Sequence, residues 1–179
     1  MSKSGTRVVA VTGACTFLGG ELLRRLEEDP KVHKVLALDI RPPALAPGSK
    51  VEFVKLDLTQ PTVDAELATL RTRHTNDPFV HGACLAGPTH ASEWAHELEG
   101  VGTMDVLNAC VGVPPRRFVM VSTTLIYGAH PKNPNFLVED AELKGHRDSR
   151  FVNDKLRAEK HVQRYAKEYP GVEVCILRF

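Results

Sequence analysis

Short apolar runs recur along the chain and alternate with longer segments that mix apolar and charged residues. Most of these runs are almost continuous in Val, Ile, Leu, Ala and Phe, which is expected for parallel strands covered on both faces. The predicted strands are Arg7–Val11, Val35–Asp39, Val51–Leu56, Phe79–Cys84, Arg117–Ser122 and Val172–Leu177.

Three of the intervening segments carry apolar residues at helical spacing, and the first is expected to end at Asp29-Pro30. The segment Tyr127–Ser149, with its prolines and glycines, is typical of a long loop. Strands that alternate with helices predict a parallel sheet with right-handed crossovers. The three predicted helices run through Leu18–Leu26, Trp94–Leu107 and Phe151–Glu168.

Composition and charge narrow the class of protein. With 179 residues, 42% of them hydrophobic, the chain is long enough to bury a substantial core in one domain. Its 23 basic and 22 acidic side chains leave a net charge of +1, which argues against a protein that coats nucleic acid or a membrane surface. No apolar run approaches the roughly 20 residues that cross a bilayer, and residues 1–7 lack the apolar stretch of a secretory signal. We expect a cytoplasmic protein without nucleic-acid or membrane partners.

The cysteines and histidines form no metal or redox motif. The four cysteines include no C-x-x-C pair, and the eight histidines include no H-E-x-x-H. Cysteine in apolar surroundings behaves as a small hydrophobic residue, so reduced thiols are expected. No metal site is predicted.

The most informative segment runs from Val8 to Gly20, where a predicted strand leads through a glycine turn into the first helix. Free N–H groups and the dipole at a helix N-terminus favour a pyrophosphate, and dinucleotide-binding folds carry G-x-G-x-x-G or a variant there. Gly13 and Gly19 stand six positions apart, with Thr16 in the middle slot. The Thr16 side chain occupies space where backbone usually approaches a phosphate, and its hydroxyl is a candidate donor to a phosphate oxygen.

An acidic residue at the expected distance favours a dinucleotide site. Asp39 ends the second predicted strand, 20 residues after Gly19, which is the separation of a carboxylate that binds the adenosine ribose. A carboxylate repels a 2′-phosphate, so NAD(H) is favoured over NADP(H). Arg41 keeps NADP(H) open, because an arginine near this position accommodates that phosphate.

Other interpretations of the turn differ in how much they explain. A P-loop is excluded, since no Gly-Lys-Ser/Thr follows the turn. A plain strand–helix turn without a ligand explains the glycines but not the position of Asp39. S-adenosylmethionine-dependent methyltransferases also combine a glycine turn with an acidic strand end, and they stay open as an alternative.

Six short motifs lie at the ends of the predicted strands or within a predicted helix. They are Thr12-Gly13-x-x-x-Phe17-Leu18-Gly19, Leu38-Asp39-Ile40-Arg41, Asp57-Leu58, Leu85-Ala86-Gly87, Gly102-Thr103 and Val121-Ser122-Thr123-Thr124-Leu125-Ile126-Tyr127-Gly128. Together they give essentially the whole chain a resemblance to the extended short-chain dehydrogenase/reductase superfamily, in its NAD-dependent epimerase/dehydratase group. The resemblance implies a Rossmann-type, doubly wound parallel sheet of about six strands in the order 3-2-1-4-5-6, with helices on both faces in three α/β/α layers.

The resemblance also implies where NAD would bind. The pyrophosphate would lie on the glycine turn, the adenosine ribose on Asp39, and the adenine beside Asp57 and Leu58. The nicotinamide ribose would lie near the segment after the fourth strand and near Lys155. The implied cofactor-binding residues are Gly13, Thr16, Phe17, Leu18, Gly19, Asp39, Arg41, Asp57, Leu58, Leu85, Ala86, Gly87 and Lys155.

The chain departs from the family at a residue that carries catalysis. In the family a Ser or Thr on the fifth strand works with a Tyr-x-x-x-Lys on the next long helix, and Thr123 fits the hydroxyl position. The aligned segment here runs from Phe151 to Lys155, so the phenol that transfers the proton is absent. Loss of a general acid or base costs roughly 10²–10⁴-fold in rate. The implied catalytic residues are therefore Thr123 and Lys155.

No other tyrosine restores this motif. Tyr127, Tyr165 and Tyr169 are followed four positions later by Pro131, Tyr169 and Glu173 rather than by lysine. Tyr127 is expected to pack at the end of the fifth strand.

The resemblance bears on domain organisation as well. Extended family members continue past the strand that ends here in Arg178-Phe179 with a segment over the nicotinamide and a smaller substrate domain. We expect residues 1–179 to form a single NAD(P)-binding Rossmann domain, with the substrate domain missing or truncated. Whether the natural chain continues is left open.

Three functions fit these features. The first is an NAD-binding domain with impaired catalysis that acts as a nucleotide-responsive regulatory module or as an interaction module for a protein partner. The second is an active NAD-dependent oxidoreductase or sugar-nucleotide epimerase/dehydratase that uses Thr123 and Lys155 without the usual Tyr. The third keeps the fold and binds nothing. A homodimer through the helices around 94–110 and 151–169 is also expected, because family members often dimerise through these helices.

Overall fold

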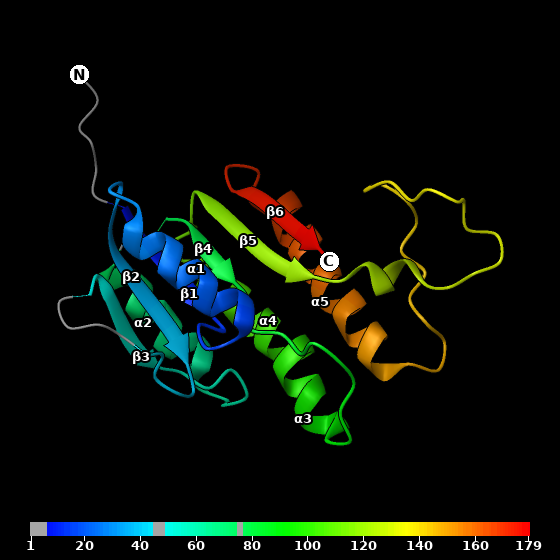
Figure 1. Ribbon diagram of the computed structural model, residues 1–179, viewed down its shortest axis with the longest axis horizontal. Helices are drawn as coiled ribbons and strands as arrows, with labels where there is room; N and C mark the ends of the chain where they lie inside the picture. Colours follow the sequence, from blue (N-terminus) through cyan, green and yellow to red (C-terminus); the bar gives the residue numbers. More distant parts are fainter. Residues whose placement is uncertain (1–6, 45–48, 75–76) are drawn as a thin grey trace.

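Six parallel strands form one sheet in the order β3-β2-β1-β4-β5-β6 (Figure 1), which confirms the predicted doubly wound arrangement. The computed structural model describes residues 7–44, 49–74 and 77–179, so most of the polar N-terminal segment lies outside the described residues. The strands are β1 (Arg7–Thr12), β2 (Val32–Asp39), β3 (Val51–Lys55), β4 (Phe79–His81), β5 (Arg117–Ser122) and β6 (Glu173–Arg178).

Helices lie on both faces of the sheet and complete three layers. α1 (Phe17–Glu28) packs on one face, over apolar side chains of β1 and β2 such as Val11 and Val35. α2 (Val63–Arg73), α4 (Gly102–Ala109) and α5 (Arg150–Glu168) cover the opposite face. Right-handed crossovers require this division, because the chain leaves β1 in one direction to reach β3 and in the other direction to reach β6.

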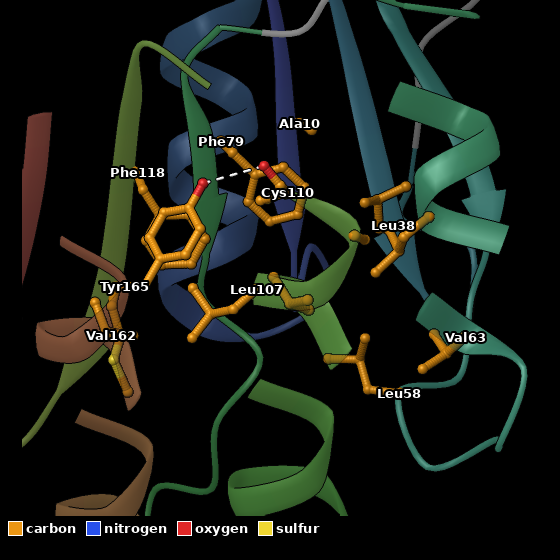
Figure 2. Packing of buried hydrophobic residues seen from close by; sticks show 14 of the residues in the cluster. Ala10, Leu38, Leu58, Val63, Phe79, Leu107, Cys110, Phe118, Val162 and Tyr165 are labelled. Carbon is orange, nitrogen blue, oxygen red and sulfur yellow. Dashed lines mark hydrogen bonds between the residues drawn. The ribbon is translucent and has the colours of Figure 1, made fainter. Parts of the chain in front are cut away.

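The larger core lies between the sheet and α2, α4 and α5 (Figure 2). The rings of Phe79 and Phe118 stack with centroids 5.8 Å apart, and Tyr165 from α5 tilts against Phe118. The Tyr165 hydroxyl donates to the Cys110 carbonyl at 3.2 Å, so this buried polar group has its partner. Burial raises the pKa of the phenol. Tyr165 is therefore a core residue.

β4 is shorter than the sequence predicts, since it ends at His81 rather than at Cys84. The Gly82 N–H still donates to the Thr12 carbonyl at 3.1 Å. The backbone then leaves the sheet and passes directly against Gly13. The end of β4 is thus set by its approach to the turn after β1.

The helices differ from the prediction at two places. The apolar pattern of the sequence does not predict α2, because the few buried side chains of this helix lie in a single row along it. These side chains are Val63, Leu67 and Arg71. The helix predicted through Trp94–Leu107 consists of α3 (Ser92–His96), a π-helical segment η1 (Glu97–Val101) and α4. After η2 (Thr124–Tyr127), residues 128–149 form the long loop that the sequence predicts.

Replacing Phe118 with Ala tests the packing between β5 and α5. The ring is fully buried, so Phe118→Ala is expected to lower the free energy of unfolding by about 3–5 kcal/mol, measured by urea denaturation. Phe136→Ala is the control, because this ring on the long loop is 88% exposed and its loss is expected to change stability by at most about 0.5 kcal/mol. Equal effects of the two substitutions would contradict this placement of the core.

Candidate nucleotide-binding site

The carboxyl ends of β1, β2, β3 and β4 meet at one edge of the sheet, beside the start of α1. Open parallel sheets bind ligands at this edge, at the point where the strand order reverses. Here the reversal falls between β1 and β4, and a cavity of about 180 Å³ lies among the strand ends. Five predicted cofactor residues line it: Gly13, Thr16, Asp39, Asp57 and Leu58.

Parts of the cavity wall are not identified by the sequence. Ala83 and Cys84 line it from the segment after β4, and Trp94 and Leu98 line it from α3 and η1. Trp94 looks like one position of a buried helical stripe, yet it is exposed. The only signal in the sequence is that a large aromatic residue stands at the start of this helix.

Other predicted cofactor residues lie outside this cavity. Arg41 lines a separate hollow of about 710 Å³ between α1 and the β2–β3 connection. Leu85, Ala86 and Gly87 follow β4 but do not line the cavity among the strand ends. The structure therefore brings together the residues expected to bind adenosine and does not join them to those expected to bind the nicotinamide ribose.

Two glycines shape the turn by having no side chain. Gly13 has a φ of +68°, and a Cβ there would lie 2.6 Å from backbone atoms of Gly82 and Ala83. A Cβ at Gly19 would collide with the carbonyl oxygen of Gly13. Both glycines are needed for the fold itself, whatever binds at the turn.

Thr16 is the N-cap of α1. Its hydroxyl accepts from the Gly19 N–H at 3.0 Å and donates to the Gly13 carbonyl at 2.8 Å. The single hydroxyl proton is therefore in use, and donation to a phosphate oxygen requires this bond to break. Among the described residues, the N–H groups of Phe17 and Leu18 have no hydrogen-bond partner, as expected for a first helical turn. These two N–H groups and the positive end of the helix dipole together favour the binding of an anion at the start of α1.

The two acidic residues of the cavity are held by backbone donors. Asp39 accepts from the Cys15 N–H with Oδ2 and from the Ile40 N–H with Oδ1, each at 2.8 Å. Oδ1 also accepts from the Arg41 N–H at 3.4 Å, so the acceptor that Asp39 retains for a ribose hydroxyl is the second lone pair of Oδ2. Burial alone raises the pKa of Asp57, but hydrogen bonds from the following turn lower it below its ordinary value. Asp57 therefore gives the cavity negative charge at neutral pH.

Lys155 is paired inside the protein rather than open to the cavity. Its Nζ donates to Glu99 Oε1 at 2.8 Å, and both side chains are only 4% exposed. The same oxygen accepts from the Leu85 N–H at 2.6 Å, and the ring of Phe151 has its centroid 5.0 Å from Nζ. The pair thus joins α5, η1 and the segment after β4. The sequence does not reveal this role of Glu99, because the residue stands among other acidic positions of the same helix.

Thr123 and Tyr127 are engaged elsewhere. Thr123 caps η2 and donates to the Phe179 carbonyl at 3.2 Å, and no hydrogen bond among the described residues joins it to Lys155. The Tyr127 hydroxyl accepts from Arg178 at 2.6 Å, and the guanidinium lies over its ring. Tyr127 packs at the end of β5, as predicted.

The described residues contain neither a metal-binding cluster nor a membrane-spanning helix. Within residues 7–44, 49–74 and 77–179, no group of three His, Cys, Asp or Glu side chains is arranged to hold a metal ion. None of the described helices is both long enough and apolar enough to cross a membrane. The four cysteines, all within the described part of the chain, are free thiols.

Comparison with known proteins identifies the family. The model of the NAD dependent epimerase/dehydratase family matches residues 9–179. The chain belongs to this family. An uncharacterized protein of Mycobacterium tuberculosis is 34% identical over 178 residues, which cover 96% of this chain and 46% of that protein. This epimerase/dehydratase-family chain therefore spans about half the length of the curated relatives that it matches.

Solved structures share the fold of this family domain. One is a Tyr-to-Phe variant of the UDP-glucuronic acid 4-epimerase of Bacillus cereus, in complex with UDP-4-deoxy-4-fluoro-glucuronic acid and NAD. It has a TM-score of 0.77 and 23% identity, over 96% of this chain and 55% of its own. WbmG of Bordetella bronchiseptica, in complex with NAD, has a TM-score of 0.79 and 18% identity, over 99% of this chain and 54% of its own. At these identities the likeness shows the fold alone.

A buried histidine links the carboxyl ends of two central strands to a helix in this epimerase/dehydratase-family domain. His81 Nδ1 lies 2.9 Å from Thr12 Oγ1, and His81 Nε2 lies 3.0 Å from Thr103 Oγ1, so the ring links β1, β4 and α4. Burial, with a smaller effect of the Lys155 charge, lowers the pKa of His81 to about 4. The imidazole is therefore neutral at physiological pH.

We predict that this histidine makes stability fall in mild acid. Because its folded pKa of about 4 lies below the unfolded value of about 6.5, the unfolded state binds the proton first as the pH falls. The contribution is complete above about pH 6.5 and is lost toward pH 4, which amounts to about 2 kcal/mol between pH 7 and pH 5. Urea denaturation across this range is the measurement. His81→Gln cannot titrate here and is expected to give a flatter profile, so parallel profiles would contradict the prediction.

Proposed function

We propose that this chain binds NAD(H) at the strand-end site but lacks the Tyr-dependent proton transfer of its family, and acts as a nucleotide-responsive regulatory or interaction module. One observation carries the proposal: at position 151 a ring without a hydroxyl lies 5.0 Å from Lys155 Nζ. Bound NAD supplies a hydride acceptor, and a general acid or base must move the accompanying proton. Phe151 can neither donate nor accept that proton.

The residues of the cavity fit the adenosine half of NAD. The free N–H groups of Phe17 and Leu18 at the start of α1 suit the diphosphate. Asp39 retains an acceptor on Oδ2 for a ribose hydroxyl, while Leu58 and Trp94 provide apolar walls beside an adenine. Because Arg41 lines the separate hollow rather than this cavity, the carboxylate of Asp39 favours NAD(H) over NADP(H).

A relative supports the combination of a missing phenol with cofactor binding. The Tyr-to-Phe variant of the Bacillus cereus epimerase is in complex with NAD, so loss of a tyrosine hydroxyl does not prevent NAD binding in that protein. We extend this to Phe151 as part of the proposal.

The active-enzyme alternative has less support. Thr123 donates to the Phe179 carbonyl and Lys155 to Glu99, so neither group is free to move a proton on a substrate. The homodimer, the protein partner, the cytoplasmic location and the domain boundaries 1–179 remain predictions.

Calorimetry with NAD⁺ and NADH tests the proposed binding. Asp39→Asn keeps the size of the side chain but removes the charge that strengthens hydrogen bonds from a ribose diol, so affinity is expected to fall about tenfold. Asp140→Asn, an exposed position on the long loop, is the control and is expected to bind like the wild type. If the wild-type chain binds neither nucleotide, the proposed function is refuted.

Phe151→Tyr tests whether Lys155 can still activate a phenol. A lone ammonium would lower the pKa of a neighbouring phenol, but here the Glu99 carboxylate neutralises it. We expect the new phenol to titrate at or above the ordinary value of about 10, measured by ultraviolet difference absorbance against the wild type. Adding Glu99→Gln is expected to lower this pKa, because the charge of Lys155 is then unopposed. A clearly depressed pKa in the single variant would favour the active-enzyme alternative.

A further inference from the structure

We propose that the site recognises the adenosine diphosphate part of a nucleotide, and that the Glu99–Lys155 pair closes the half that would hold the nicotinamide ribose. This inference rests on the proposed function and specifies which part of the nucleotide the site binds. ADP, which lacks both the nicotinamide and its ribose, is then expected to bind about as tightly as NAD itself.

The extent of the cavity is the first observation. Its volume of about 180 Å³ is below the roughly 300–1,000 Å³ usual for sites that enclose a small molecule. Its walls come from the ends of β1, β2, β3 and β4 and from the start of the α3–η1 helix. The cavity therefore offers room on the adenosine side and does not continue to Lys155.

The second observation is how Lys155 is covered. Its Nζ bonds to Glu99, and the ring of Phe151 lies beside it. Glu99 in turn accepts from the Leu85 N–H and fastens the segment after β4 to η1. At 4% exposure the ammonium is almost inaccessible to water, and a ribose hydroxyl reaches it only if α5 or the Leu85 segment moves.

A second contact holds the same two helices together. Asp154, next to Lys155 on α5, bonds through Oδ1 to His96 Nδ1 at 2.8 Å. Arg150 Nε lies 3.8 Å from the other oxygen of Asp154, whose side chain is buried. Moving α5 away from the α3–η1 helix would therefore break this contact together with the Glu99–Lys155 pair.

The balance of interactions favours the closed arrangement. Separating a buried ion pair leaves a charge without a partner, and that cost exceeds what one hydrogen bond to a neutral hydroxyl returns. Cys84 lines the cavity, and the next residue, Leu85, donates its N–H to Glu99 Oε1. The pair thus lies just behind the cavity wall, where the rest of a dinucleotide would have to pass.

Calorimetry with NAD⁺, ADP-ribose and ADP on the full 179-residue chain tests the inference. The dissociation constants of NAD⁺ and ADP are expected to agree within about fivefold. A larger preference for NAD⁺ overturns the closed half-site and leaves the proposed function intact. If none of the three nucleotides binds, the proposed function fails instead, so the two failures are distinct.

Glu99→Gln tests the assignment to this pair. The variant keeps an acceptor for the Leu85 N–H but frees the ammonium for the nicotinamide ribose, so the preference for NAD⁺ over ADP is expected to rise by about fivefold or more. Glu97→Gln makes the same chemical change at an exposed position of η1 and is expected to keep the wild-type ratio. An unchanged ratio in a folded Glu99→Gln variant overturns the assignment.

A double variant tests the inference even if Glu99→Gln alone does not fold. Glu99→Gln with Lys155→Met leaves no unpaired buried charge, and such replacements of buried pairs are often tolerated. If Lys155 contributes nothing to binding, the double variant keeps the wild-type affinity for NAD⁺. A loss of more than about fivefold would show that Lys155 does hold the nucleotide, and would overturn the inference.

Discussion

The end of β4 and the candidate site both depend on the close approach of two backbone segments at Gly13. The chain leaving β4 passes so near the turn after β1 that no Cβ fits between them. That contact ends β4 at His81 and places Ala83 and Cys84 against the glycine turn. Within the described part of the chain, the first turn of α1 also has free N–H groups beside these strand ends. The same steric constraint therefore shapes both the sheet and the candidate nucleotide-binding site.

The two halves of the site differ in how their polar groups are satisfied. On the proposed adenosine side, the donors of Phe17 and Leu18 are free among the described residues, and Asp39 keeps a spare acceptor on Oδ2. On the other side, Lys155 and Glu99 satisfy each other in a buried place. A ligand gains most where it supplies missing partners, because a group that is already bonded must first be released. The electrostatics of the site thus favour one end of a dinucleotide over the other.

The sequence predicts the parts of this structure that depend on local pattern. The strands, the glycine turn and the place of Asp39 follow from apolar periodicity and motif spacing, and the strand order that the family resemblance implies is confirmed. α2 is not predicted, since its buried stripe of Val63, Leu67 and Arg71 is too narrow. The partner of Lys155 is not predicted either, because Glu99 is 56 residues away and no local pattern connects them. Pairing across such distances depends on tertiary packing.

Phe151 and the ion pair form one interdependent unit. A ring without a hydroxyl offers Lys155 no hydrogen bond, so the buried ammonium needs another counterpart, and Glu99 provides it. Removing one partner of such a pair typically costs about 3–5 kcal/mol, whereas replacing both together is often neutral. Neither charge can therefore be lost alone without a large cost to the fold. In this structure Lys155 is thus part of the scaffold that joins α5 to η1, and this pairing is the basis of the proposed closed half-site.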